Sequence, residues 1–285
     1  MEAEEVEELR SKLKNKKRVV VKIGSSSLQH KETGDLDYIK MDILVRELCN
    51  IRNQGKDVIL VTSGAIACGR KAVHLKAANT ISEKQACAAI GQARLMMVYQ
   101  KLFAEYNQIP AQVLMTKYTI MDKESNENAH NTFVQLLKMG VIPIVNENDT
   151  ISVTELMFTD NDELSGMITS MMDMQALIIL SNIDGIYNGS PSAPGSRVIR
   201  EVDLGKDLSD YIQTGKSGFG RGGMLTKTAI ARKVADEGIT VYIANGKKDN
   251  ILVDLLACPE TTVCTRFVPA AGEVSSVKKW IAHSE

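Results

Sequence analysis

Long apolar runs, extended basic tracts and targeting segments are all missing from this 285-residue sequence. No apolar run approaches the ~18 residues of a membrane span, and no signal-peptide core follows Met1. The net charge is −1, which argues against a protein that binds nucleic acid mainly by electrostatics. We therefore expect a cytoplasmic protein without membrane or nucleic-acid partners.

Cysteine and histidine are scarce and scattered. The five cysteines form no CxxC pair, and the four histidines form no HxxxH or HExxH motif. An odd number of cysteines in these contexts is typical of a reducing compartment and gives no disulfide framework. The histidine pattern argues against a zinc site.

Charge is concentrated only at the start of the chain, where the acidic "MEAEEVEE" precedes the basic "RSKLKNKKR". Such a run is more often a solvated arm or helix than a nucleic-acid surface. We therefore interpret residues 1–17 as a charged N-terminal arm or helix, and residues 18–285 as one domain.

Short apolar strands alternate with longer amphipathic helices along the rest of the chain. The predicted strands are residues 18–24, 57–64, 109–115, 141–148, 176–182 and 240–245, and the predicted helices between and after them are residues 38–55, 83–107, 126–140, 162–174 and 222–238. The strands are apolar on both faces, as in parallel sheets covered by helices on each side. This order predicts an α/β fold, an αβα sandwich with a mostly parallel central sheet.

Polar clusters follow four of these strands, in "KIGSSS", "TSGA", "NEND" and "LSN". Open α/β sheets bind ligands at the carboxyl ends of their strands. We therefore expect these clusters to line one crevice.

Lys22 lies inside the apolar strand "VVVKIG", where a buried lysine needs an anionic partner or ligand. The alternative without a ligand is a lysine on an edge strand, where its charge prevents pairing with another chain and so aggregation. The "GSSS" turn that follows favours phosphate, because backbone N–H groups in such turns bind anions.

Two further segments are candidate anion sites. "VTSGAIACGRKA" predicts a strand, a turn and a helix N-terminus, although simple capping by Thr62 or Ser63 would give the same pattern. "SGFGRGGMLTK" contains GxGxxG but follows no clear strand, so it fails the test for a dinucleotide fingerprint. It is interpreted as a glycine-rich loop that leads into a helix carrying Lys227, with a solvated flexible loop as the alternative.

Lysines, anion sites and two carboxylate clusters, "NEND" and "DNDE", together favour phosphoryl transfer. Such catalysis consists mostly of positioning and charge neutralisation. The carboxylates could orient lysines, hold Mg²⁺ or bind a substrate ammonium group, and the residues alone leave these roles open.

The order of these motifs resembles the amino acid kinase superfamily, and most closely its glutamate 5-kinases, from Arg18 to about Trp280. The segments that carry the resemblance are "VVKIGSS", "VTSGAIACG", "KQACAAIGQARLM", "NAHNT", "VIPIVNENDT", "DNDELSG" and "GRGGMLTK". The resemblance implies ATP-dependent phosphorylation of the γ-carboxylate of L-glutamate, with Mg²⁺, as the first step of proline biosynthesis.

The resemblance also implies roles for individual residues. Lys22 and Lys227 would contact ATP phosphates and Asp162 would organise them, so these three are the catalytic candidates. The expected ATP-binding residues are Lys22, Gly24, Ser25, Ser181, Asn182, Gly220, Gly222, Gly223, Met224 and Lys227. The expected glutamate-binding residues are Ser63, Gly64, Ala65, Asn146, Asp149, Asp160 and Asn161. Asp149 would favour a free amine, unlike the related N-acetylglutamate kinases. No metal ligand is assigned.

The chain departs from the family pattern in two places. Ser181-Asn182 stands where Thr-Asp is usual, and Arg221 is more like the kinase half of the pyrroline-5-carboxylate synthases. The chain ends before a PUA domain could begin, as expected for a kinase-only form or a fragment of a fused kinase–reductase. The resemblance further implies proline feedback inhibition involving residues 115–131, a γ-glutamyl phosphate reductase as partner, and a homo-oligomer.

Three other functions are alternatives to this one. A superfamily kinase for aspartate, carbamate or N-acetylglutamate would share the fold. A non-catalytic amino-acid or nucleotide sensor should have lost a key lysine or aspartate, yet Lys22, Asp162 and Lys227 are present. A Rossmann dehydrogenase is disfavoured by the misplaced glycine motif.

Overall fold

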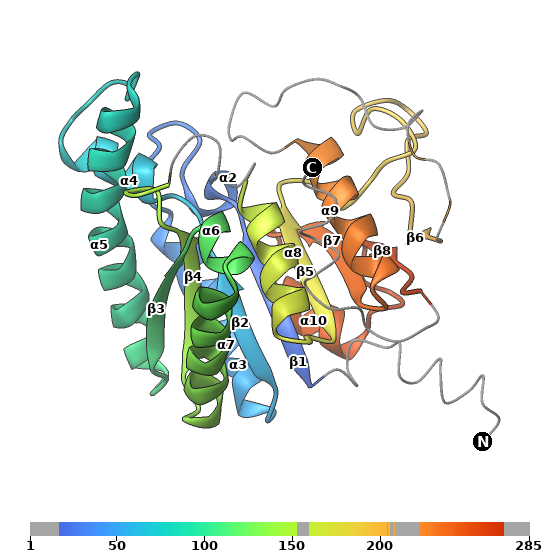
Figure 1. Ribbon diagram of the computed structural model, residues 1–285. Helices are drawn as coiled ribbons and strands as arrows, with labels where there is room; N and C mark the ends of the chain where they lie inside the picture. The colour runs from blue at the N-terminus through green and yellow to red at the C-terminus, as the bar shows by residue number, and fades with distance from the viewer. Residues whose placement is uncertain (1–16, 153–159, 204, 206–207, 209–222, 271–285) are drawn as a thin grey trace.

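The computed structural model describes residues 17–152, 160–203, 205, 208 and 223–270 (Figure 1). The predicted N-terminal arm and most of the glycine-rich loop, including Gly220 and Gly222, lie outside the described residues.

Eight strands form one sheet in the order β3-β4-β2-β1-β5-β7-β8-β6. The predicted strands are β1 (Arg18–Ile23), β2 (Asp57–Val61), β3 (Pro110–Met115), β4 (Ile142–Glu147), β5 (Ala176–Ser181) and β7 (Thr240–Asn245). All neighbouring strands are parallel except β7 and β8, so the mostly parallel sheet is confirmed. The short edge strands β6 (Glu201–Val202) and β8 (Thr265–Phe267) were not predicted.

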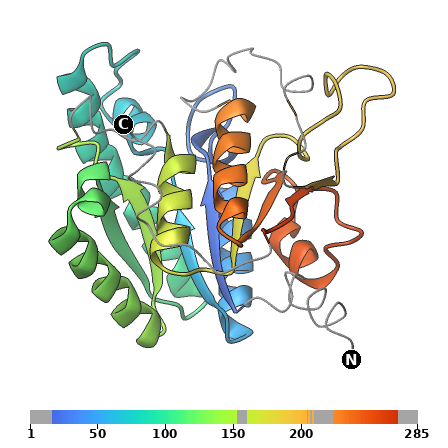
Figure 2. The same ribbon diagram turned by 45° about the vertical axis from the view of Figure 1, so that its right-hand side comes forward.

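Helices cover both faces of this sheet (Figures 1 and 2). The longer ones are α3 (Tyr38–Asn53), α5 (Ile81–Glu105), α7 (Lys123–Lys138), α8 (Asn161–Met171) and α9 (Met224–Asp236). The shorter ones are α2 (Ser25–Leu28), α4 (Ala65–Ala72), α6 (Lys117–Met121) and α10 (Ile251–Ala257). Helices α3, α5 and α10 share one core with the sheet, and α7, α8 and α9 share the other. The αβα sandwich is therefore confirmed.

The alternation of β1 decides where Lys22 points. Val19 and Val21 pack into the core of α3 and α5, whereas Val20 packs into the core of α8 and α9. Because side chains alternate with a period of two, Lys22 lies on the same face as Val20, toward α8. A lysine on this face reaches the side chains at the start of α8.

Local signals in the sequence explain where the first long helix begins and ends. The side chain of Asp37 caps α3 by accepting from the backbone N–H of Lys40 at 3.1 Å. Leu44, Leu48 and Ile51 are buried on one face, and Gly55 follows the helix with φ of 76°. This is the predicted glycine stop.

Two glycines hold α4 against α5 at unusually short range. A Cβ atom on Gly91 would lie 1.7 Å from the carbonyl oxygen of Ala65, and one on Gly69 would lie 1.8 Å from that of Cys87. The backbones can approach this closely only without side chains at these positions. The contact therefore fixes the start of α4 relative to the sheet.

No helix among the described residues has both the length and the apolar character needed to cross a bilayer.

Candidate active site

Asp162 joins the two lysines singled out in the sequence. Its Oδ1 lies 2.5 Å from the Nζ of Lys22, and its Oδ2 lies 2.9 Å from the Nζ of Lys227. The Asp162 side chain is fully buried, while those of Lys22 and Lys227 are 5% and 12% exposed. Residues from β1, α8 and α9 thus form one cation–anion–cation cluster.

The structure contradicts one alternative and one prediction made for the first anion site, namely the edge-strand lysine and the open GSSS turn. Lys22 lies on a central strand, since β1 pairs with β2 on one side and β5 on the other, so the edge-strand interpretation is wrong. The residues after Gly24 form the short helix α2 and not an open turn. Gly24 lies close to the lysine, because a Cβ atom there would be 3.7 Å from the Nζ of Lys22.

The charge state of Asp162 follows from its neighbours. Burial by itself would raise its pKa, but Lys22 and Lys227 outweigh burial and lower the pKa to about 2. The carboxylate is therefore ionised at neutral pH and keeps the two ammonium groups near each other.

Asp160 has the opposite shift. Burial, and then the negative charge of Asp162, raise its pKa to about 6 despite the nearby lysines. Its Oδ1 caps α8 by accepting from the N–H of Asp162 at 2.7 Å and of Glu163 at 3.3 Å. Its Oδ2 is buried and has no hydrogen-bond partner among the described residues. This oxygen is available to a ligand.

The residues expected to bind ATP lie at the ends of strands and at the start of a helix that are close to one another. Ser181 is the last residue of β5 and Asn182 follows it, beside the end of β1, where Ile23 pairs with Leu180. Gly223 begins α9 without any side-chain cap among the described residues, and Met224 is the first helical residue. Lys227 is one turn further along. The end of β1, the end of β5 and the start of α9 therefore meet around the lysine cluster.

All seven residues expected to bind glutamate line one cavity of about 390 Å³. They are Ser63, Gly64, Ala65, Asn146, Asp149, Asp160 and Asn161. Ser25, from the nucleotide-side group, lines the same cavity. The two polar clusters of the sequence therefore meet at one hollow beside the lysine cluster.

Asn161 ties three elements together at this cavity. Its Nδ2 lies 2.6 Å from the carbonyl oxygen of Thr62, 2.8 Å from the Oγ of Ser63 and 2.8 Å from the Oδ1 of Asn146. The ends of β2 and β4 are thereby linked to the start of α8. The capping alternative for this turn is not seen, because Gly64 begins α4, with φ of 110° and no side-chain cap among the described residues.

Several lining residues were missed from the sequence. Gln29, Gly34, Ile66, Ala67, Arg70, Ala78, Lys84 and Glu147 also face the cavity. Arg70 lies three and four residues after Ala67 and Ile66 and so shares their helix face, but nothing in the sequence marks this face as part of the cavity. Lys84 comes from α5, which the sequence does not mark as a neighbour of the cavity.

No group of three or more potential metal-ligating side chains occurs among the described residues.

Comparison with known proteins agrees with this geometry. Residues 17–245 match the sequence profile of the amino acid kinase family. A relative named glutamate 5-kinase from Bacteroides thetaiotaomicron is 60% identical over 94% of this chain and 74% of its own length. Another from Synechococcus sp. is 45% identical over 93% of this chain and 72% of its own. A third from Clostridium perfringens is 40% identical over 93% of this chain and 100% of its own.

Solved structures support the fold at low sequence identity. A UMP kinase from Ureaplasma parvum superposes with a TM-score of 0.61 at 14% identity, covering 89% of this chain and 99% of its own. An isopentenyl phosphate kinase gives 0.62 at 14% identity, covering 88% and 99%. The chain belongs to the amino acid kinase family, and within it its sequence groups with the glutamate 5-kinases.

Proposed function

We propose that this protein transfers the γ-phosphoryl group of ATP to the γ-carboxylate of L-glutamate. The observation that carries the proposal is the buried Lys22–Asp162–Lys227 cluster beside a cavity rich in carboxylates and amides. Relatives named glutamate 5-kinase, one of them 60% identical, support the same reaction.

The chemistry needs charge neutralisation more than proton transfer. A carboxylate oxygen of the substrate attacks the γ-phosphorus, a new oxygen–phosphorus bond forms, and the bond between this phosphorus and the ADP oxygen breaks. The attacking carboxylate is already ionised at neutral pH, so no general base is required. The groups required are cations for the phosphoryl oxygens, which Lys22 and Lys227 supply.

Asp162 acts through the lysines in this proposal. By pairing with both ammonium groups it keeps two like charges close together in a buried place, where they would otherwise repel. It is therefore a positioning residue for the ATP phosphates.

Asp149 lines the cavity and supplies a carboxylate for the substrate ammonium group. Such a contact favours a free α-amine over an N-acylated one. Asn161 and Ser63 are held together by a hydrogen bond of 2.8 Å and supply polar groups for the substrate carboxylates.

Mg²⁺ would accompany ATP and neutralise charge on its phosphates when bound. The described residues fit this need only in part, because both oxygens of Asp162 face lysines. The Oδ2 of Asp160 is buried, has no hydrogen-bond partner within the described part of the chain, and fits a magnesium ligand, directly or through water.

The product would be an acyl phosphate, a class that is hydrolysed readily. A γ-glutamyl phosphate reductase fits as the partner that consumes it, and proline fits as a regulator of the pathway that the relatives' name implies.

A hydroxylamine trap tests the proposal. The protein is incubated with Mg²⁺-ATP and hydroxylamine, together with L-glutamate, L-aspartate, N-acetyl-L-glutamate or bicarbonate plus ammonia. We expect ADP release and hydroxamate with L-glutamate alone. Hydroxamate formed from another acid would mean that the protein is an amino acid kinase with a substrate other than glutamate. A folded protein that binds ATP but releases no ADP with any substrate would instead be a sensor.

A further inference from the structure

The glutamate cavity carries two cations that the sequence did not single out. Arg70 comes from α4 and Lys84 is the fourth residue of α5, and both line the cavity while only partly exposed. The same cavity is lined by the carboxyl groups of Glu147, Asp149 and Asp160. A substrate that carries charges of both signs is therefore expected there.

We propose that Arg70 and Lys84 form the subsite for the α-carboxylate of the substrate and so set the requirement for an α-amino dicarboxylate. This inference rests on the proposed function and adds the residues that recognise the non-reacting end of glutamate.

The contacts of the two cations support this assignment. The Lys84 ammonium group has no ion pair or hydrogen bond with any residue that the structure describes. Within the described part of the chain, the Arg70 guanidinium makes one long hydrogen bond, in which Nη1 donates to the carbonyl oxygen of Lys76 at 3.4 Å. Both side chains therefore retain donors for a carboxylate, and arginine in particular suits the two oxygens of such a group.

Neighbouring donors extend the subsite. The Nε2 of Gln29 is buried and without a hydrogen-bond partner among the described residues, and Gln29 lines the same cavity. This atom lies 3.8 Å from the position of a Cβ atom on Gly64, at the start of α4. The first residues of α4 face the cavity, and no side chain in the described part of the chain caps them. The subsite thus combines two cations, one orphaned amide donor and a positive helix end.

The charged side chains around the cavity lie in three groups, one for each charged group of glutamate. The reacting γ-carboxylate would lie toward Lys22 and Lys227, the ammonium group toward Asp149, and the α-carboxylate toward Arg70 and Lys84. Without the last pair, the second carboxylate would face the three acidic side chains of the cavity without a counter-charge.

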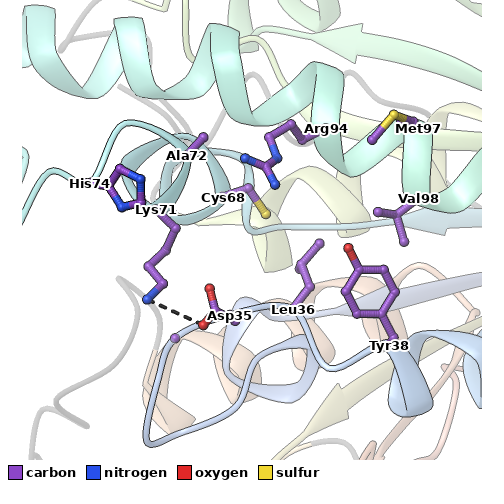
Figure 3. A pocket seen from close by; sticks show the side chains of 11 residues that line it. Asp35, Leu36, Tyr38, Cys68, Lys71, Ala72, His74, Arg94, Met97 and Val98 are labelled. Carbon is purple, nitrogen blue, oxygen red and sulfur yellow. Dashed lines mark ion pairs between the residues drawn. The ribbon is translucent and has the colours of Figure 1, made fainter.

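The chain provides matched controls in a second cavity of about 370 Å³ (Figure 3). Lys71, which follows Arg70 on α4, lines this second cavity and lies 3.5 Å from Asp35. Arg94 lies on α5 like Lys84 and also lines the second cavity. Replacing Lys71 or Arg94 removes one positive charge from the same helix as replacing Arg70 or Lys84, but neither control residue lines the glutamate cavity.

The test compares Arg70→Gln and Lys84→Gln with Lys71→Gln and Arg94→Gln. Each is assayed by hydroxamate formation, with glutamate and ATP varied separately. We expect each of the first two changes to raise the glutamate KM about 10- to 100-fold, the scale for one charge-assisted hydrogen bond. The ATP KM and kcat should change less than about threefold, and the two controls should match the parent protein. Arg70→Lys, which keeps the charge, should recover part of the loss.

4-Aminobutanoate, which is glutamate without its α-carboxylate, gives an independent readout. Its kcat/KM, or its Ki against glutamate where turnover is too slow, should be the same in the parent protein and in Arg70→Gln and Lys84→Gln within about threefold. If a variant loses the same factor in kcat/KM with glutamate and with 4-aminobutanoate, the α-carboxylate subsite is wrong and the replaced residue has a structural role. A glutamate KM that is unchanged in both variants would overturn it as well. Thermal melting identifies a variant that fails to fold, in which case Arg70→Met or Lys84→Met, which also removes the charge, replaces it. If the parent protein forms no hydroxamate from glutamate, the proposed function itself fails.

Discussion

In the proposed mechanism, Asp162 positions the two lysines without itself touching the reacting atoms. A fully buried carboxylate is costly unless it is paired, and here it has an ammonium group on each oxygen. The arrangement keeps two cations on the α8 side of the sheet, where β1 and the start of α9 converge. This is the local feature on which the phosphoryl-transfer account depends.

Replacing Lys227 with alanine should lower kcat by about 10²- to 10³-fold, the scale for losing one preorganised electrostatic donor. The lysine would act in the transition state, so substrate affinity should change much less. Steady-state hydroxamate kinetics measure this, with Lys138→Ala, an exposed lysine of α7, as the control. A near-normal kcat would remove Lys227 from the mechanism.

Replacing Asp149 with alanine should act differently. The carboxylate would bind the ammonium group equally in ground and transition states, so the glutamate KM should rise while kcat is largely kept. Initial rates over a range of glutamate concentrations measure it, beside Asp236→Ala on the exposed end of α9. An unchanged KM would place Asp149 outside the substrate site.

Residues with a strong local signature were easier to predict than those without one. Lys22 stands out because it interrupts an apolar strand, and Asp162 because it belongs to a dense acidic cluster. Arg70 and Lys84 look like ordinary helix-surface charges in the sequence. Their place in the cavity depends on how α4 packs on α5, which is a long-range property.

At the level of elements, the contact between α4 and α5 links packing to the cavity. Gly91 has no room for a side chain, since a Cβ atom would lie 1.7 Å from the Ala65 carbonyl oxygen and 2.4 Å from the Gly69 nitrogen. Ala65 is also the first residue of α4 and lines the cavity. The distance between the two helices therefore helps to shape the substrate site.

Gly91→Ala should destabilise the protein and weaken glutamate binding together. Two backbones would have to separate, at a cost of about 1–3 kcal/mol or more, and the start of α4 would move. Thermal melting and the KM values for glutamate and ATP measure this, with the exposed Ala89→Ser on the same helix as control. Normal stability with a normal glutamate KM would show that the helices can adjust without cost.

A second element-level feature is the buried Glu47 of α3, which is 2% exposed and supports the start of α10. Its Oε2 accepts from the backbone N–H of Leu252 at 2.6 Å. Burial raises its pKa to about 7, although the N–H groups of Leu252, Val253 and Asn250 act in the other direction. The folded state therefore binds more protons than the unfolded state between the unfolded pKa of 4.5 and about 7.

This shift predicts a pH dependence with a definite sign. The free energy of unfolding should fall as the pH rises from 4.5 to about 7, because the folded state must then ionise a buried acid. Glu47→Gln keeps a hydrogen-bond acceptor and lacks the ionisation. It should match the parent protein near pH 4.5 and exceed its stability at pH 8 by about 1–3 kcal/mol. Urea unfolding at both pH values measures this, and a constant difference would contradict the assigned shift.

The sequence predicted the long elements well and the short ones poorly. Strands such as β5 are apolar throughout and helices such as α3 have clear caps, so local pattern is enough. Strands β6 and β8 have two and three residues, too few to show a period. They exist because the end of the sheet offers β8 an antiparallel place beside β7.

At the scale of the whole molecule, the site depends on convergence at one edge of the sheet. The carboxyl ends of β1, β2, β4 and β5 and the starts of α4, α8 and α9 meet there, although they are spread over more than 200 residues from Lys22 to Lys227. The parallel order made this edge predictable from the sequence alone. The depth and charge balance of the cavity depend on side-chain packing and required the structure.

Isotope transfer tests the central claim most directly. L-Glutamate labelled with ¹⁸O in both γ-carboxylate oxygens is incubated with the protein, Mg²⁺-ATP and hydroxylamine, and the released phosphate is examined by ³¹P NMR. If the γ-carboxylate attacks the γ-phosphorus, the bridging oxygen stays with phosphorus when hydroxylamine displaces it, so each phosphate carries one ¹⁸O atom. Phosphate released without ¹⁸O would mean that water attacks ATP, and the proposed glutamate kinase reaction would be wrong.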